Sequence, residues 1–263
     1  MTSLIAVSDR PAVGRRAGHP TRAVLRNETR LILRDPVGLL WGLVVPLIAF
    51  VAISRISALR HPEAGLGGAS YLATYQPIII VFSLTILAIN GLPPILGSYR
   101  ERGVLRRLQA TPMPPARLLF VLLTIHLVGA AAVAAVILAV GTIGSGLALP
   151  HQLAGWILAY LLTAVAMLGL GVLIAALSPS GKIANGVGGI LTFPLLFTAG
   201  LWLPLAAMPH ALATVSDYSP LGAGVRAMTA AAGGHFPPLS ALGTLLAYAV
   251  VFCALAVRFF RWE

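Results

Sequence analysis

Six long apolar segments, separated by shorter polar ones, constrain the fold of this chain more than any other feature. A helix needs about 20 mostly apolar residues to cross a lipid bilayer. Within the bilayer, where no water is present, a helix satisfies the hydrogen-bonding groups of its own backbone. We therefore predict an all-α integral membrane protein with six transmembrane helices. We expect Pro93 and Pro94 to end the second one, because proline breaks a regular helix. The predicted spans cover residues 37–57, 72–92, 118–143, 153–177, 183–203 and 239–257.

The charge distribution predicts the orientation of the chain in the membrane. Only 10% of the 263 residues are charged, and the formal net charge is +11. Of the 18 Lys and Arg residues, 15 lie before the first span, in segment 98–117, at position 182 or after the sixth span. Basic residues favour the cytoplasmic side, so both termini are expected to be cytoplasmic. Because these residues flank the spans, they indicate contact with anionic membrane lipid rather than with nucleic acid.

The segment before the first span is predicted to be an amphipathic helix in the membrane interface. It covers residues 19–35 and follows a tail, residues 1–18, that we expect to be disordered. Glu28 interrupts its apolar side. One interpretation is that the Glu28 side chain extends to the membrane interface or pairs with a nearby residue. The other is that Glu28 contacts an arginine of segment 98–117 or a partner protein. Arginines recur at every fourth position and share one side of the helix, namely Arg22, Arg26, Arg30 and Arg34.

The segment between the fifth and sixth spans is apolar but repeatedly interrupted. Pro204, Pro209 and Pro220, together with several glycines, make it unsuitable for one transmembrane helix. Backbone groups at membrane depth must find partners within the protein. We therefore expect short helices that re-enter the outer leaflet.

The ionisable residues exclude several kinds of chemistry. None of the seven Asp and Glu residues lies within a predicted span, whereas proton-coupled transport and membrane-embedded catalysis ordinarily use such groups. Gly181-Lys182 is followed by Ile183, so the phosphate-binding loop pattern fails. The chain is therefore expected to bind no metal or cofactor and not to be an enzyme. His126 and Asn90 lie within or at the end of spans, where each either bonds to a neighbouring helix or lines a transport path.

The charged segment between the second and third spans is predicted to contain a cytoplasmic helix over residues 98–110. Ser98 and Glu101 have the spacing of a capping box, and Thr111-Pro112 ends the helix. From these properties alone, a helix anchored on anionic lipid is one possible interpretation. The apolar face of this helix carries Val104, Leu105 and Leu108. The remaining surface is basic and includes Arg106 and Arg107.

The order of residues in this segment resembles the type-2 ABC exporter permease family, in particular drug-resistance permeases of the daunorubicin type. The family has threonine more often where this chain has Val104. A second stretch agrees, with a Gly-x-x-x-Pro step at Gly200 and Pro204, then Met208-Pro209 and Ser219-Pro220-Leu221. The resemblance covers roughly residues 20–260, and the matching positions of the first stretch are Glu101, Gly103, Leu105, Leu108, Thr111 and Pro112.

The resemblance implies a transport mechanism. Residues 19–263 would form a type-2 ABC transmembrane domain in a bacterial cell membrane, paired with a second copy or a sister permease. A separate ABC ATPase subunit would bind ATP and Mg²⁺ and would contact helix 98–110, the coupling helix, in which Leu105 and Leu108 would matter more than any arginine.

The substrate implied by the resemblance is hydrophobic or amphipathic, such as a drug, an antibiotic or a lipid-like molecule, and it would be exported between the two copies. His126, Asn90, Gly200 and the prolines of segment 204–220 are the candidates for the pathway or its outer lid. The alternative hypothesis is an ATP-independent transporter or channel whose 98–117 loop only binds lipid.

Overall fold

The computed structural model of the chain describes residues 20–260, except 33, 35–37, 39, 67 and 110–114. Within these residues the chain is all helical, as predicted, and its only extended pairing is an isolated bridge between Pro62 and Ser70. The α-helices are α1 (Pro20–Ile32), α3 (Val45–Arg55), α4 (Tyr71–Thr85), α5 (Leu92–Glu101), α6 (Val104–Gln109), α7 (Pro115–Ala139), α8 (Leu153–Leu177), α9 (Gly181–Thr198), α10 (His210–Asp217), α11 (Pro220–Ala232) and α12 (Leu239–Phe259). Three π-helical segments, η1 (Leu40–Val44), η4 (Ile86–Gly91) and η5 (Val140–Gly144), and three short 3₁₀ turns, η2 (Ser57–Arg60), η3 (Ala64–Leu66) and η6 (Leu205–Ala207), complete the set.

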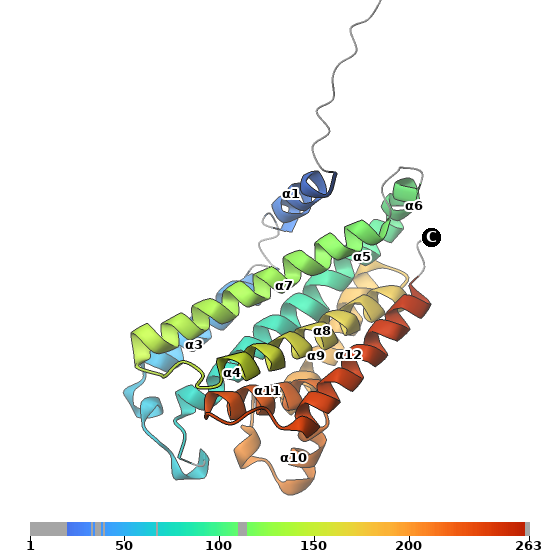
Figure 1. Cartoon of the computed structure of the whole chain (residues 1–263). Coiled ribbons are helices and arrows are strands. Elements are labelled where there is room, and N and C mark those ends of the chain that lie inside the picture. The colour runs from blue at the N-terminus through green and yellow to red at the C-terminus, as the bar shows by residue number, and fades with distance from the viewer. Residues whose placement is uncertain are drawn as a thin grey trace, which may run out of the picture.

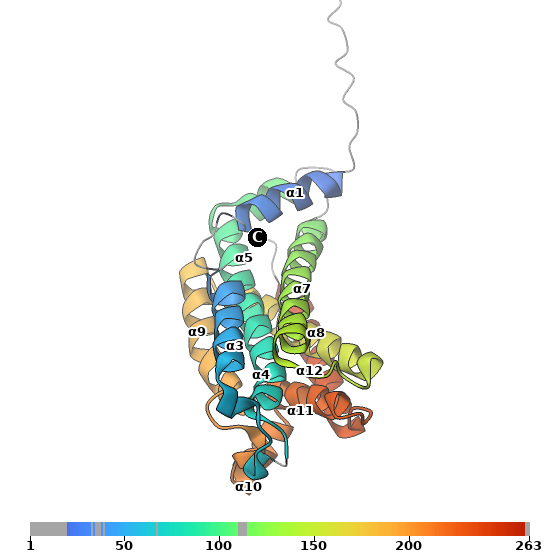
Figure 2. The same cartoon turned by 90° about the vertical axis from the view of Figure 1, so that its left-hand side faces the viewer.

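The long helices run side by side in one bundle (Figure 1). The amphipathic helix α1 lies across one end of this bundle, where α6 and the last turn of α12 are also found (Figures 1 and 2). The short helices α10 and α11 lie at the opposite end. The two ends of the described chain therefore lie at the same end of the bundle.

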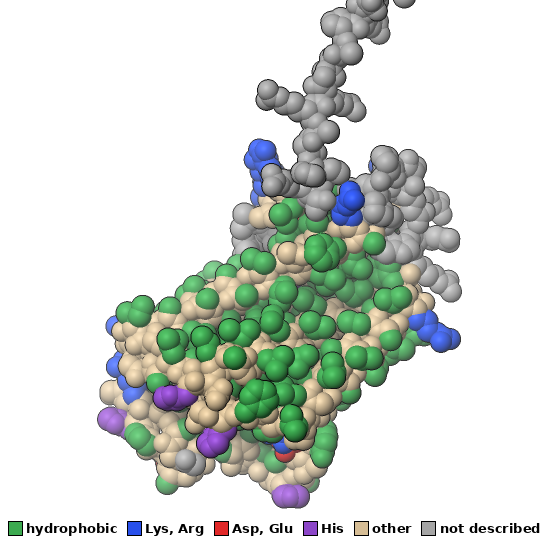
Figure 3. Space-filling view, in the orientation of Figure 1, with side chains coloured by type: hydrophobic (Ala, Val, Ile, Leu, Met, Phe, Trp, Pro, Cys, Tyr) green, Lys and Arg blue, Asp and Glu red, His purple; other side chains and the backbone are tan. Residues whose placement is uncertain are grey.

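Among the residues that the structure describes, four helical stretches are long and apolar enough to cross a membrane: Tyr71–Glu101, Ala116–Gly144, Leu153–Leu177 and Leu239–Phe259. The first predicted span forms the shorter apolar helix Leu40–Arg55. The fifth forms α9, whose first turns carry Lys182 and Asn185. The count of six crossings and the cytoplasmic side of the termini stay predictions. Hydrophobic side chains cover the middle of the face in Figure 3, and basic side chains lie toward its edges.

The second predicted span differs from expectation, because Pro93 and Pro94 do not end it. The chain stays helical from Tyr71 to Glu101 through α4, η4 and α5. The π-helical turn widens the helix just before the prolines, so that the amide of Leu92 donates to the carbonyl of Leu87, five residues earlier. A proline inside an α-helix removes a donor and clashes with the carbonyl four residues back. Here the clash is avoided by the wider turn.

Two glycines of neighbouring helices lie against backbone carbonyl groups of this π-helical turn. A Cβ added at Gly188 of α9 would lie 2.5 Å from the carbonyl oxygen of Ile89, and a Cβ at Gly171 of α8 would collide with that of Ala88. The carbonyl of Ile89 has no helical donor because Pro93 lacks an amide hydrogen, and the carbonyl of Ala88 loses its donor because the amide of Leu92 donates to Leu87 instead. The two glycines let the backbones of α8 and α9 approach these polar groups closely, as small residues do in membrane helices.

The interrupted segment after α9 folds into η6, α10 and α11. Ser219 accepts a hydrogen bond from the amide of Gly222 at 3.0 Å and Pro220 occupies the first turn of α11, which is the usual start of a helix. The expected short helices are therefore present, and their re-entry into the membrane stays a prediction. Gly200, with a φ of +90°, ends the preceding helix in a conformation that favours glycine.

Candidate functional site

The charged segment forms a helix, a sharp turn and a second short helix, rather than one helix over residues 98–110. Gly103 lies in the turn with a φ of +65°, and its amide donates to the carbonyl of Arg100 at 3.0 Å. Ser98 lies inside α5 and does not cap a helix, because α5 is the continuation of α4. The predicted capping box is therefore wrong. Glycine is the residue that adopts this left-handed backbone most readily, which explains its place here.

The apolar side of α6 faces the chain itself. Leu105 is only 1% exposed and belongs to the core, with α6 packed against α5 and α7. This differs from the expectation that Leu105 contacts the ATPase subunit, since its side chain is already covered within the chain. Val104 is half-buried, whereas Arg107 is exposed. Thr111 and Pro112 lie outside the described residues, as do the side chains of Arg106 and Leu108.

Three consecutive residues at the end of α5 contact three other parts of the chain. Tyr99 donates a hydrogen bond of 2.6 Å to the carboxylate of Glu28 in α1. Arg100 donates through Nη1 to two carbonyl oxygens at the end of α8. Glu101 accepts a hydrogen bond of 3.1 Å from the amide of Gly181, the first residue of α9. The turn at Gly103 is therefore joined directly to α1, α8 and α9.

Arg100 makes the most extensive of these contacts. Its Nη1 lies 3.1 Å from the carbonyl oxygen of Ala175 and 2.9 Å from that of Ser178, and its guanidinium lies 5.6 Å from the ring centre of Phe260. The carboxyl end of a helix carries a partial negative charge and carbonyls without helical donors. A cation placed there stabilises the end of α8 and links it to α5 and to the residue that follows α12.

A groove of about 760 Å³ begins at this end of the bundle and follows η4 and α5. Its walls also include residues of α1, η1, α7 and α9. The volume lies in the range of sites that take drug-sized molecules. The wall is mainly apolar. Besides Tyr99 it contains four large aromatic side chains, Trp41, Phe82, Phe193 and Trp202, and the rings of the last two stack with centroids 6.0 Å apart.

The polar groups of this groove lie in two places. Asn90, Thr192 and His126 lie where η4, α7 and α9 meet. There the amide nitrogen of Asn90 donates to the hydroxyl of Thr192 at 2.8 Å, and this hydroxyl donates to the carbonyl of Gly188 at 2.8 Å. At the mouth of the groove lie Glu28 and Tyr99, joined by their hydrogen bond. Asn90 and His126 therefore line the same groove, and a role for either of them in a transport pathway stays a prediction.

Other predicted site residues have different surroundings. Pro204, Pro209 and Pro220 shape the segment around α10 and α11 and do not line the groove. Arg26, Arg30 and Arg34 are exposed, while the side chain of Arg22 lies outside those described. Glu28, in contrast, is buried with 6% of its surface exposed. Its partner is Tyr99, which settles its environment in favour of a contact across the chain, although with a tyrosine rather than an arginine.

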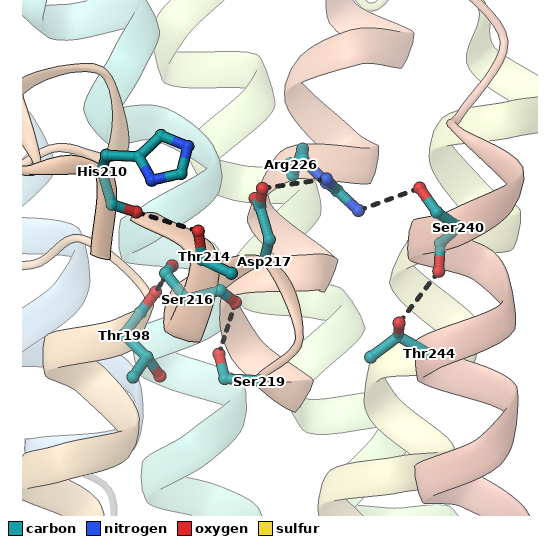
Figure 4. Close-up of polar contacts among 9 residues, drawn as sticks. All are labelled: Thr198, His210, Thr214, Ser216, Asp217, Ser219, Arg226, Ser240 and Thr244. Carbon is teal, nitrogen blue, oxygen red and sulfur yellow. Dashed lines mark hydrogen bonds and ion pairs between the residues drawn. The ribbon is translucent and has the colours of Figure 1, made fainter. Parts of the chain in front are cut away.

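Polar contacts also join the elements at the opposite end of the bundle (Figure 4). Asp217 of α10 and Arg226 of α11 form an ion pair of 3.1 Å, and Arg226 donates to the hydroxyl of Ser240 in α12 at 3.2 Å. The hydroxyl of Ser216 donates to the carbonyl of Thr198, at the end of α9. These contacts join α10 to α9 and to α11, and α11 to α12.

The ion pair between Asp217 and Arg226 is expected to contribute little to stability. Both side chains are about one-third exposed, and exposed pairs contribute about 0–1 kcal/mol. We expect Asp217→Asn to lower the melting temperature of the purified chain by no more than about 3 °C. Arg226→Met should cost more, because it also removes the bond to Ser240. A double variant that is no less stable than Arg226→Met would confirm that Asp217 acts through Arg226. A fully additive loss would contradict it.

Two comparisons with known proteins agree with this structure. The profile of the ABC-2 type transporter family matches residues 20–232. The chain is also similar to a Bacillus subtilis (strain 168) protein named "Putative transport permease YvfS". The two are 25% identical over 240 residues, which cover 87% of this chain and 92% of that protein.

Proposed function

The chain belongs to the ABC-2 type transporter family, and we propose that it is the membrane permease of an exporter driven by a separate ATPase subunit. The matched region contains both the α5–α6 turn and the groove beside it. Under this proposal the chain works with a second permease, either another copy or a sister chain, in the bacterial cell membrane. ATP and Mg²⁺ would bind to the ATPase.

The observation that carries this proposal is the set of contacts at the end of α5. A subunit that changes shape with ATP must move the permease through a small number of rigid connections. The turn at Gly103 lies at the end of the bundle, and the three residues before it contact α1, α8 and α9. A displacement of the turn would therefore reach several membrane helices at once.

The surface that this turn offers to an ATPase is polar. Glu101, Arg102 and Arg107 are exposed, and Arg107 donates to the carbonyl of Arg102 at 3.3 Å. Leu105 points into the chain. We therefore propose that charged side chains and the shape of the turn recognise the ATPase, while Leu105 holds α6 in place. Replacing Leu105 by Asp would unfold this packing and would not isolate a docking contact.

Gly103→Ala tests the turn with little change in side-chain volume. At a φ of +65° alanine is strained by about 1–2 kcal/mol, so we expect the turn to distort and several-fold less ATPase to co-purify with the tagged chain. Gly103→Asn should bind nearly as much ATPase as wild type, because asparagine tolerates this backbone. The matched control is Gly68→Ala, which has the same kind of strain at a φ of +85° in the loop before α4.

Two results would contradict the proposal. If Gly68→Ala and Gly103→Ala reduce ATPase binding equally, the effect is general destabilisation. If the purified chain alone carries substrate across liposome membranes without an ATPase, the permease is not driven by ATP and the alternative of an independent transporter or channel is correct.

A further inference from the structure

The groove beside α5 contains acceptor groups in its interior, and this polarity indicates what it binds. The ring nitrogen Nδ1 of His126 lies 2.8 Å from the carbonyl oxygen of Leu122. A carbonyl can only accept, so Nδ1 carries the hydrogen. In the neutral ring, Nε2 is then an acceptor. His126 is 4% exposed, and its side chain is one of those that line the groove.

Gly91 keeps the surroundings of this nitrogen open. A Cβ added at Gly91 would lie 3.3 Å from Nε2 of His126. Gly91 is the last residue of the π-helical turn η4 and also lines the groove. Any side chain here would press against the imidazole ring.

Asn90 adds a second acceptor. The hydroxyl of Thr192 donates to the carbonyl of Gly188 and must therefore accept from Asn90, which identifies the Asn90 atom that faces it as the amide nitrogen Nδ2. The carbonyl oxygen Oδ1 is then the acceptor that Asn90 contributes to the groove wall. Bonds arranged in one direction polarise each other and strengthen such an acceptor.

Glu28 supplies negative charge at the mouth. Its carboxylate accepts from Tyr99, and within the described part of the chain no ion pair to it is found, the one pair there being Asp217–Arg226. Arg102 also lines the mouth, but its side chain is exposed, so water screens its charge more than that of buried Glu28. The buried charge at this end of the groove is thus negative.

We infer that this groove binds a lipophilic amine, with its ammonium group at Glu28 and a further N–H or O–H donor at His126 and Asn90. This inference rests on the proposed transport function and names the substrate class of the same groove. Tyr99 and Asn90 are nine residues apart along a helix, which separates the two polar places by about 13 Å. The four aromatic side chains of the wall hold the apolar body, and aromatic faces also attract cations.

The test measures binding of a fluorescent amine to the full-length chain in lipid nanodiscs. The probe is N-dansyl-1,10-diaminodecane, which has an ammonium group and a sulfonamide N–H separated by a chain long enough to span the two polar places. Trp41 and Trp202 line the groove and transfer excitation energy to a dansyl group bound there. The neutral reference probe is the same molecule with its amine acetylated, which keeps the sulfonamide N–H.

We expect saturable binding of the amine probe, about tenfold or more tighter than binding of the acetylated probe. Glu28→Gln keeps a partner for Tyr99 but removes the charge, so it should abolish this preference. The matched control is Glu63→Gln, which alters an exposed carboxylate in the loop before α4 and should leave the preference intact. His126→Phe should weaken both probes about equally, several-fold, because both carry the sulfonamide donor.

Three results would overturn the inference: equal binding of the two probes, a preference that survives Glu28→Gln, or a signal that does not saturate because the probes only dissolve in lipid. Absence of any binding, as would occur if a second copy of the chain filled the groove, would overturn it too. ATPase co-purification and ATP hydrolysis are measured on the same variants. If both are intact while the probes bind equally, only the ligand class is wrong; if no ATPase is found while selective binding holds, only the proposed function is wrong.

Discussion

Gly188→Ala is expected to lower the melting temperature of the chain by about 4–8 °C, whereas Gly186→Ala, in the same helix, should not lower it. The added methyl group at Gly188 would lie 2.5 Å from the backbone oxygen of Ile89, and a backbone cannot move aside as a side chain can. Overpacking of this kind costs about 1–3 kcal/mol. A net loss of about 2 kcal/mol corresponds to the temperature shift given above for a chain of this size.

Gly186 is a matched control because its surroundings are open. Apart from its chain neighbours and the backbone of its own helix, no atom lies within 4 Å of a Cβ built there, so alanine only gains helix propensity, about 0.5–1 kcal/mol. Melting is followed through tryptophan fluorescence of the purified chain in detergent. Gly171→Ala provides a second test, since its methyl group would collide with the carbonyl of Ala88 on the same turn. Equal melting temperatures for Gly188→Ala and Gly186→Ala would show that α9 does not approach η4 closely.

The hydropathy of the sequence predicts the long helices well, because their burial in lipid depends on local composition. The fourth predicted span, residues 153–177, coincides with α8. The continuation of α4 through Pro93 and Pro94 was missed for the opposite reason. Judged from the local sequence, two consecutive prolines end a helix. In the folded chain, glycines of α8 and α9 leave room for the backbone carbonyls just before the prolines. Contacts of this kind depend on the folded chain and leave no pattern near the prolines.

In the candidate site, too, features visible in the local sequence were predicted, and those that depend on contacts between distant residues were missed. His126 and Asn90 were identified because polar residues inside apolar segments are conspicuous. Tyr99 was not, since tyrosine at the end of a span is unremarkable, and its partner Glu28 is 71 residues away in the sequence. The Ser98–Glu101 spacing gave a wrong helix start, because a capping motif has no effect where a helix is already under way. Glu101 bonds to the start of α9 instead.

Arg100→Met is expected to reduce substrate transport per ATP hydrolysed at least tenfold in the reconstituted exporter. The substitution removes both hydrogen bonds to the end of α8 and the contact with Phe260, while an apolar side chain of similar length still fills the space. Charge-assisted bonds contribute about 1.5–3 kcal/mol each, so α5 and α8 would lose most of their polar connection. A displacement of the turn at Gly103 would then no longer move α8.

Arg100→Lys separates charge from geometry. Lysine keeps the cation near the carbonyls of Ala175 and Ser178, but its compact ammonium cannot reproduce the planar guanidinium over Phe260. We expect this variant to transport at an intermediate rate. The matched control is Arg258→Met, which removes an exposed arginine of α12 at the same end of the bundle and should change transport less than twofold.

The outcome is decided by measuring ATPase binding, ATP hydrolysis and transport on the same preparations. If Arg100→Met binds the ATPase and hydrolyses ATP as wild type does but fails to transport, Arg100 transmits motion between the turn and α8. If hydrolysis and transport fall in the same proportion, the arginine only supports the fold. Transport at the wild-type rate would contradict a role for this contact, because the remaining bonds of Tyr99 and Glu101 would then suffice to connect the turn with the membrane helices.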